Sequence, residues 1–241
     1  MSTDALPLVP GAINFRDVGG LPATGGTTRP GVLFRSGSLA QLGDEGRAAL
    51  VALGLRRIVD LRDVDEVAHE PSRTDGLDIL TVHAPLFLGS TASFLSENLS
   101  LAQLYRVMVD TSSARIVEAV RAVLADQPVL VHCAAGKDRT GITVALMLAA
   151  SGVERDAVVA DYARTERLLS PARNASIIAH LQSRHPDAAN LIELATRSPA
   201  PVMRALLDDV DERFGSPADY LRASGLSEDE VAGLREVLIA R

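Results

Sequence analysis

The sequence predicts a single α/β domain: a central, mostly parallel sheet flanked by helices, with a helical C-terminal third. Short apolar and β-branched runs alternate with segments of helical periodicity up to residue 151, and from Glu154 onwards every segment has helical periodicity. The chain has 241 residues and no shift in composition that would divide it. Residues 1–241 are therefore expected to form one domain.

Five short segments are the expected strands of the sheet: residues 13–18, 32–35, 57–61, 79–85 and 129–131. Residues 19–31, with five glycines and two prolines, are typical of a turn-rich loop or an open hairpin. Residues 1–12 show little periodicity and are predicted to lie over the surface as an irregular arm.

Helical periodicity and terminal signals predict the helices. These are residues 44–53, 116–124, 139–151, 155–165, 172–184, 188–196, 201–214, 217–223 and 228–240. Apolar residues at helical spacing also occur between residues 87 and 109, where core packing and a mobile cover are both open interpretations.

Composition excludes several classes of function. The formal net charge of −7 argues against nucleic acid and against broad attraction to anionic membranes. The sequence shows no apolar run of about eighteen residues and no secretory signal, so we expect no integral membrane segment and a cytoplasmic location. Export without a cleaved signal is the alternative. Nothing in the sequence indicates the oligomeric state.

One stretch concentrates the chemistry, VLVHCAAGKDRTG at residues 129–141, which contains the only cysteine and the only lysine of the chain. It predicts a buried strand, a glycine-containing loop and a helix that begins near Arg139. A helix N-terminus gathers unpaired N–H groups and a positive dipole end, which suits an oxyanion. The same field, with the Arg139 guanidinium, favours the thiolate form of Cys133. The planar fork of arginine can also pair two phosphate oxygens at once.

The loop sequence HCAAGKDRTG resembles the active-site signature of the cysteine-dependent protein tyrosine phosphatase superfamily. Its GKDRTG ending is similar to the bacterial branch that includes mycobacterial protein tyrosine phosphatase B, a branch of tyrosine, dual-specificity and phosphoinositide phosphatases. The likeness continues, in chain order, through NFRDVGGLP (14–22), RPGVLFRSG (29–37), VDLRD (59–63), VVADY (158–162) and GSPADYLRASGLS (215–227). It therefore covers most of the chain.

The resemblance implies a cysteinyl-phosphate mechanism without metal or organic cofactor. Cys133 would attack phosphorus, and Thr140 would hydrogen-bond the sulfur. The equatorial phosphate oxygens would be held by Arg139 and by the loop residues Ala134, Ala135, Gly136, Lys137 and Asp138. The lysine at position 137 is a further point of resemblance, to lipid phosphatases of the superfamily, in which a loop lysine contacts extra phosphates on an inositol ring. The alternative is that Lys137 is a solvated charge on the loop.

Several polar residues near the loop carry open alternatives. The resemblance to the bacterial branch makes Asp138 a candidate for the general acid; the alternative is a residue that caps the helix or orients Arg139. His132 is expected to support the loop behind Cys133. Asp60, Arg62 and Asp63 end a buried strand and form either the rim of the site or a local ion pair. Asp60 and Asp63 are the other candidates for the acid.

The remaining histidines, His69, His83, His180 and His185, lack the spacing of metal ligands, so no metal is expected. A reactive thiolate in an exposed loop is open to oxidation. A cover is therefore expected from residues 87–108 or 172–196, the latter inside a candidate helical lid at 164–200.

The sequence thus predicts a hydrolase of phosphate monoesters. Its substrates would be phosphotyrosine, phosphoserine or phosphothreonine proteins, or phosphoinositides, or both. The alternative is a catalytically silent phosphate-binding module that holds a phosphorylated partner.

Overall fold

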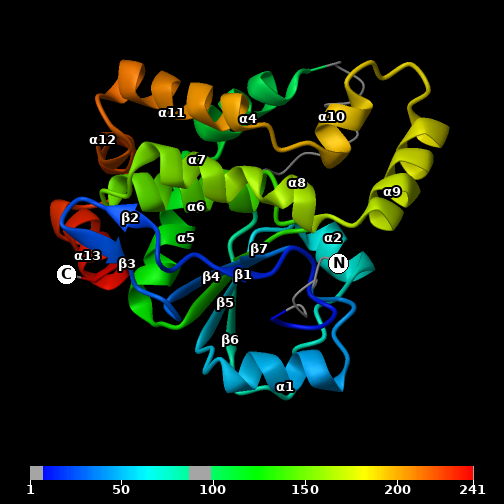
Figure 1. The fold of residues 1–241 in the computed structure, drawn as a ribbon, viewed down its shortest axis with the longest axis horizontal. Helices are drawn as coiled ribbons and strands as arrows, with labels where there is room; N and C mark the ends of the chain where they lie inside the picture. Colours follow the sequence, from blue (N-terminus) through cyan, green and yellow to red (C-terminus); the bar gives the residue numbers. More distant parts are fainter. Residues whose placement is uncertain (1–7, 87–98, 241) are drawn as a thin grey trace, which may run out of the picture.

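The computed structural model describes residues 8–86 and 99–240, and it is built on a five-stranded sheet (Figure 1). The strand order is β1 (Arg16–Asp17), β4 (Leu33–Ser36), β7 (Val129–His132), β5 (Arg57–Asp60) and β6 (Leu80–His83). β4, β7, β5 and β6 are parallel, and β1 is antiparallel to β4. The predicted central, mostly parallel sheet is confirmed.

The register of the central strand aligns three polar strand ends. His132 of β7 pairs with Ser36 of β4 and with Asp60 of β5. Because parallel strands end at the same edge of a sheet, the chain beyond His132 begins level with these two residues. The loop at residues 133–138, called the functional loop below, was predicted to lie at this edge.

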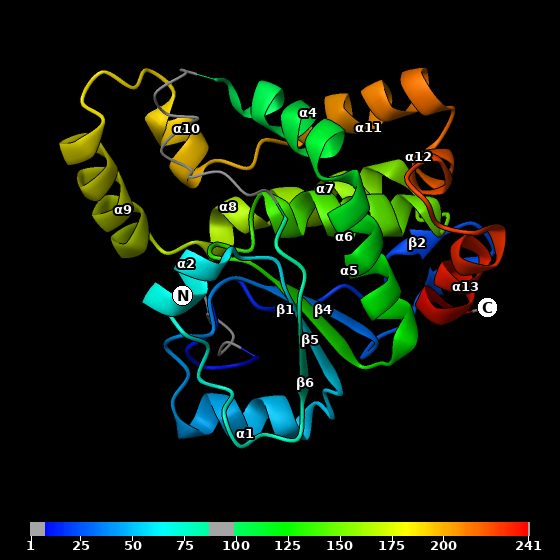
Figure 2. The same cartoon turned by 180° about the vertical axis from the view of Figure 1, so that it is seen from behind.

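Helices cover both faces of the sheet and form most of the C-terminal half (Figures 1 and 2). Five helices precede residue 151: α1 (Asp44–Ala52), α2 (Val64–His69), α4 (Leu101–Thr111), α5 (Ser113–Ala125) and α6 (Arg139–Ala150). They are followed by α7 (Arg155–Ala163), α8 (Thr165–Leu168), α9 (Pro171–Arg184), α10 (Leu191–Thr196), α11 (Ala200–Phe214), α12 (Pro217–Ala223) and α13 (Glu228–Leu238). Within residues 8–86 and 99–240, no helix is long and apolar enough to cross a lipid bilayer.

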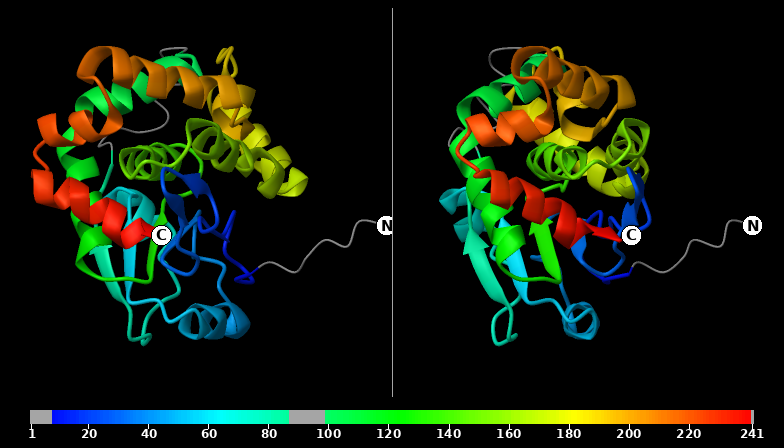
Figure 3. Two further views of the ribbon diagram at one scale, coloured as in Figure 1. Left: turned by 60° about the vertical axis from the view of Figure 1, so that its left-hand side comes forward. Right: turned by 90° about the vertical axis from the view of Figure 1, so that its left-hand side faces the viewer.

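A second, three-stranded sheet joins residues 22–28 to the C-terminal end of the chain (Figure 3). β2 (Pro22–Ala23) and β3 (Gly26–Thr28) form the hairpin that was one of two readings of residues 19–31. The prediction of helix to residue 240 is wrong at its end, because β8 (Ile239–Ala240) pairs with β3. The Arg29 N–H also donates to the Leu238 carbonyl at 2.7 Å, so the last helical carbonyl gains a partner there.

Further differences concern the expected elements. α2 and α8 were not predicted. α5 begins three residues before its expected start, and α10 begins three residues after it. The N-terminal arm is irregular from residue 8, yet Val9 is fully buried instead of lying on the surface. The cover candidate at residues 87–108 falls partly on residues 87–98, which lie outside the described part of the chain.

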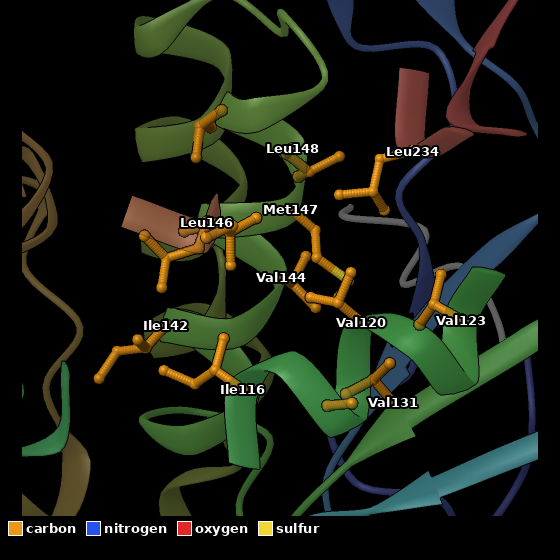
Figure 4. Packing of buried hydrophobic residues seen from close by; sticks show 14 of the residues in the cluster. Ile116, Val120, Val123, Val131, Ile142, Val144, Leu146, Met147, Leu148 and Leu234 are labelled. Carbon is orange, nitrogen blue, oxygen red and sulfur yellow. The ribbon is translucent and has the colours of Figure 1, made fainter. Parts of the chain in front are cut away.

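The sheet separates two hydrophobic clusters, because alternate residues of a strand face opposite sides. On the α1 side lie Phe34, Ile58 and Leu130, with Val9, Leu39, Leu42, Leu50 and Leu55. On the other side, Val131 of β7 lies below α5 and α6, and Leu234 of α13 closes the cluster (Figure 4). Residues Thr140 to Leu148 of α6 are all buried, so this helix packs on every side and the loop before it has a fixed support.

A buried cluster of charges ties the first strands to α7. The Asp161 carboxylate accepts from Arg16 Nε and from Arg35 Nη1, each at 2.8 Å, and all three side chains are at most 4% exposed. Burial alone would raise the pKa of Asp161, but the two guanidinium groups hold it below its usual range. Three elements distant in the sequence therefore meet at one carboxylate.

Asp161→Asn is expected to lower the free energy of unfolding by roughly 3–5 kcal/mol, because it leaves two buried guanidinium groups without a counter-charge. Since the folded pKa of Asp161 is depressed, its contribution is present above the unfolded value of about 3.9. That contribution is lost as pH falls through the folded value. Urea unfolding between pH 3 and 7 would measure both effects. At the acid end of this range, the free energy of unfolding should depend less steeply on pH in the variant than in the wild type. Asp156→Asn, at an exposed ion pair with Arg204, is the control and should cost under about 1 kcal/mol. Equal losses in the two variants would contradict the assigned role.

Candidate functional site

The predicted loop connects the central strand to the buried helix. It leaves β7 at His132 and enters α6 at Arg139, with Asp138 at the N-cap position. The strand and helix that carry it are both buried, so its ends are fixed.

The loop carbonyls are turned toward the first strands. The Ala134 carbonyl accepts from the Ser38 N–H at 2.8 Å. Asn14 Nδ2 donates to the carbonyls of Ala135 and Gly136 at 3.3 and 3.0 Å, and Arg35 Nη2 donates to the Gly136 carbonyl at 2.9 Å. Three successive carbonyls are thus held by the scaffold.

This anchoring fixes the direction of the neighbouring N–H groups. In a trans peptide the N–H of the next residue points opposite to the carbonyl. The N–H groups of Ala135, Gly136 and Lys137 therefore point away from the scaffold, and none donates to an acceptor in the part of the chain that the structure describes. Together with the start of α6 they form a cradle for an anion.

Gly136 is required by the close approach of the loop to β4. Its φ is +67°, and a Cβ at this position would lie 2.5 Å from the Ser36 carbonyl carbon. A Cβ on Gly37 would likewise lie 2.7 Å from the Ala135 carbonyl carbon. Any side chain at either position would push the loop off the strand end and release the carbonyls that orient it.

A pocket opens above the loop and collects most of the predicted residues. Its floor is lined by Cys133, Ala134, Ala135, Lys137, Asp138 and Arg139. Its walls are lined by Leu104 and Met108 of α4, Arg173, Ile177 and Leu181 of α9, and Leu194 and Ala195 of α10, with Glu66 of α2 at its side. Cys133 is only 2% exposed, so the thiol lies at the bottom of a mostly apolar pocket.

Arg139 is held by Glu66, a residue that the sequence analysis missed. Arg139 Nη1 and Nη2 both donate to the Glu66 carboxylate, the second at 2.7 Å. Burial opposes the charge on Arg139, but the Glu66 hydrogen bonds and the attraction of Cys133 raise the pKa of Arg139 above its usual range. The guanidinium is thus a permanent, oriented cation.

Glu66 also closes the first turn of α2. The Asp63 side chain accepts from the Glu66 N–H at 2.8 Å, and Glu66 Oε2 accepts from the Asp63 N–H at 2.9 Å. This reciprocal capping box has a sequence signature, an N-cap acid followed three residues later by glutamate. The signature predicts a helix start; it gives no sign that Glu66 reaches Arg139.

Asp138 neither caps α6 through its side chain nor accepts a hydrogen bond from Arg139 in the described part of the chain. Its Oδ1 instead accepts from the Tyr105 hydroxyl at 2.7 Å and from Lys137 Nζ at 2.6 Å. The helix-capping and arginine-orienting interpretations therefore have no support in the geometry.

Lys137 is buried, with an exposed fraction of 1%. Its Nζ donates to the Arg197 carbonyl at 3.0 Å as well as to Asp138. The ammonium therefore ties the loop to the C-terminal end of α10 and is not a solvated loop charge. This arrangement contradicts the alternative of a solvated charge, while its predicted contact with inositol phosphates stays a prediction.

The strand-end charges form a local ion pair below the loop. Asp60 binds Arg62 Nε at 2.9 Å and Nη2 at 2.6 Å, and both residues are buried. Burial alone would raise the pKa of Asp60, but His132 and Arg62 hold it well below its usual range. His132 Nε2 lies 3.4 Å from Asp60 Oδ2, close enough to favour the ionised carboxylate. Neither Asp60 nor Asp63 lines the pocket, which argues against both as the acid.

Thr140 lies at the start of α6 and is fully buried. Its hydroxyl has no hydrogen-bond partner among residues 8–86 and 99–240, so the expected bond to the Cys133 sulfur is not formed in this structure. In the same part of the chain no group of three or more His, Cys, Asp or Glu side chains is arranged to hold a metal ion.

Known proteins resemble this chain over most of its length. Residues 7–240 match the model of the tyrosine phosphatase family. The chain is 34% identical to the triple specificity protein phosphatase PtpB of Mycobacterium tuberculosis, over 96% of this chain and 98% of PtpB. It is 30% identical to a tyrosine-protein phosphatase of Nostoc commune, over 89% and 76%. Among solved structures, P. aeruginosa TpbA aligns with a TM-score of 0.40 and 18% identity, over 77% of this chain and 95% of TpbA.

A family match over nearly the whole chain, and relatives aligned over most of their own length, agree with the cysteine at the base of an anion cradle. The protein therefore belongs to the tyrosine phosphatase family and is a cysteine-dependent phosphatase.

Proposed function

We propose that the protein hydrolyses phosphate monoesters through a cysteinyl-phosphate intermediate formed on Cys133. The observation that carries this proposal is the position of Cys133 at the floor of the pocket, beside the outward N–H groups and Arg139. The thiolate lone pair forms the S–P bond while the P–O bond to the leaving group breaks. Arg139 and the cradle hold the three equatorial oxygens as charge builds on them.

The proton for the leaving group comes from Asp138, whose carboxyl lines the same pocket. The alcohol departs neutral and Asp138 becomes a carboxylate. In the second step the carboxylate takes a proton from water, whose oxygen bonds to phosphorus as the S–P bond breaks. The thiolate and the protonated acid are restored, and the products are an alcohol and inorganic phosphate.

The walls of the pocket favour a phosphate on an apolar group. Leucine, isoleucine and methionine side chains from α4, α9 and α10 surround the space above Cys133, which suits the ring of phosphotyrosine. Phosphorylated proteins are thus the proposed substrates. Phosphoinositides are the second candidate, because Arg173 adds a half-buried cation to the wall.

We also propose that α9 and α10 form the cover over Cys133 within the single domain. α9 and α10 pack against each other (Figure 2), and both contribute residues to the wall of the pocket. α9 has no fully buried residue, so little core packing holds it in place. This supports residues 172–196 as the lid candidate.

Hydrolysis of para-nitrophenyl phosphate in EDTA tests the proposed function. The wild-type chain should turn the substrate over without added metal, and Cys133→Ser should lose at least about 10³-fold in kcat, because the hydroxyl is a far weaker nucleophile. A strict requirement for metal, or unchanged activity in Cys133→Ser, would overturn the mechanism. Absence of turnover on every phosphoester tried would instead favour the silent binding module.

Glu66→Gln should lower kcat/KM roughly 10- to 100-fold, because it weakens a charged hydrogen-bond pair that orients Arg139. Glutamine still completes the capping box, so α2 itself is expected to stay folded. Asp44→Asn removes an exposed charge from the first turn of α1, which does not line the pocket, and serves as the control. Equal kinetics in the two variants would show that Arg139 needs no orienting carboxylate.

Lys137→Ala should weaken hydrolysis of phosphotyrosine peptides and of phosphoinositides by similar factors, since its ammonium is bound to Asp138 and to the Arg197 carbonyl. A panel of both substrate classes would measure the ratio, with Arg184→Ala at the exposed far end of α9 as control. A selective loss on phosphoinositides would show that the ammonium leaves these partners to meet additional phosphates.

A further inference from the structure

Two buried tyrosines lie behind Asp138. The Tyr105 hydroxyl of α4 contacts Asp138 Oδ1 and the Tyr162 hydroxyl of α7, both at 2.7 Å. The rings of Tyr105 and Tyr162 meet edge to face with centroids 6.0 Å apart, and both side chains are fully buried. A chain of hydrogen bonds therefore runs from Tyr162 through Tyr105 to one carboxylate oxygen of Asp138.

The direction of these hydrogen bonds follows from the number of protons. A phenol has one proton to donate, and Tyr105 gives it to the Asp138 carboxylate. Tyr105 must then accept from Tyr162, whose hydroxyl donates to it. Burial, followed by the charge of Asp138, raises the pKa of Tyr105 well above its usual range, so this donor keeps its proton.

The same contacts distinguish the two oxygens of Asp138. Oδ1 accepts from both Tyr105 and Lys137. Oδ2 has no hydrogen-bond partner within the described residues, although the carboxyl group lines the pocket. The oxygen that can carry and release a proton toward a leaving group is therefore Oδ2.

Space for this arrangement is built into α6. A Cβ on Gly141 would lie 3.0 Å from Tyr162 Cδ2, so the glycine lets the tyrosine ring pack directly against the helix. A side chain at this position would shift the Tyr162 ring and lengthen its hydrogen bond to Tyr105. α6, the helix that follows the functional loop, therefore also provides the space in which Tyr162 packs.

We propose that Tyr105 is a positioning residue for the general acid, oriented in turn by Tyr162, and that it holds Asp138 Oδ1 so that Oδ2 faces the leaving group. The inference rests on the proposed function, and in particular on Asp138 as the acid. If Tyr105 only stabilised the fold, removing its hydroxyl would slow the hydrolysis of all substrates by the same factor. A positioning tyrosine acts only where the leaving group needs a proton.

The test compares Tyr105→Phe with the wild type on para-nitrophenyl phosphate and on a phosphoserine peptide. A serine alkoxide needs general acid help worth roughly 10²–10⁴ in rate, whereas para-nitrophenolate leaves without it. Tyr105→Phe should lower kcat on phosphoserine roughly 10- to 100-fold and on para-nitrophenyl phosphate under about 3-fold. The alkaline limb of the pH–rate profile of Tyr105→Phe on phosphoserine should move to higher pH, because the variant lacks the hydroxyl that donates to the Asp138 carboxylate.

A double-mutant cycle makes the inference specific. In an Asp138→Asn background, Tyr105→Phe should change kcat on phosphoserine by under about 3-fold, because the proton donor is already absent. Tyr162→Phe should act in the same direction as Tyr105→Phe but more weakly, and it remains informative if Tyr105→Phe fails to fold. Tyr220→Phe removes a buried hydroxyl that donates to the Val109 carbonyl, away from Asp138, and should leave the substrate ratio unchanged.

Equal losses on both substrates, or additivity with Asp138→Asn, would overturn the inference. So would an Asp138→Asn variant with no leaving-group dependence, since Tyr105 would then have no acid to position. Each of these results leaves Cys133-dependent hydrolysis standing. Failure of the proposed function itself would appear separately, as activity that survives Cys133→Ser.

Discussion

The peptide planes of the functional loop are the constraint on which the site depends. Their carbonyls are bound by Ser38, Asn14 and Arg35, and this alone aims the following N–H groups at the pocket. An anion cradle made of side chains would have to order long, flexible groups, whereas backbone groups fixed by folding need no reorganisation when charge develops. The glycines at the contact with β4 make that fixation possible.

The buried charged residues around Asp161 are hydrogen-bonded to the groups that hold the loop. Arg35 binds the Gly136 carbonyl with one nitrogen and Asp161 with another, so the ion cluster and the loop share one guanidinium. Asn14 accepts from Arg16 through its side-chain oxygen while its amide nitrogen holds the loop. The first strands, α7 and the loop therefore form one hydrogen-bonded unit, in which the loss of one member disturbs the others.

Much of the fold and the centre of the site could be predicted because their signals are local. The β-branched runs gave the sheet strands, and the residues from Cys133 to Arg139 lie next to one another in the sequence. The partners of those residues are 73 positions away in the case of Glu66 and Arg139, and 33 positions away for Tyr105 and Asp138. No periodicity encodes such pairings. β8 was missed because two residues cannot display a strand pattern, and the burial of Lys137 because lysine is mostly exposed.

The placement of Glu66 on α2 has a consequence for local dynamics. α2 is six residues long and has no buried side chain, so its capping box and the contact with Arg139 contribute much of what holds it. Elements of this kind open far more often than the whole domain unfolds, and their amides exchange with solvent accordingly. Each opening releases Glu66 and with it the orientation of Arg139. The fraction of molecules competent for chemistry is thus set partly by a fraying equilibrium on the surface, and a substitution on the solvent face of α2 can change it without touching the pocket.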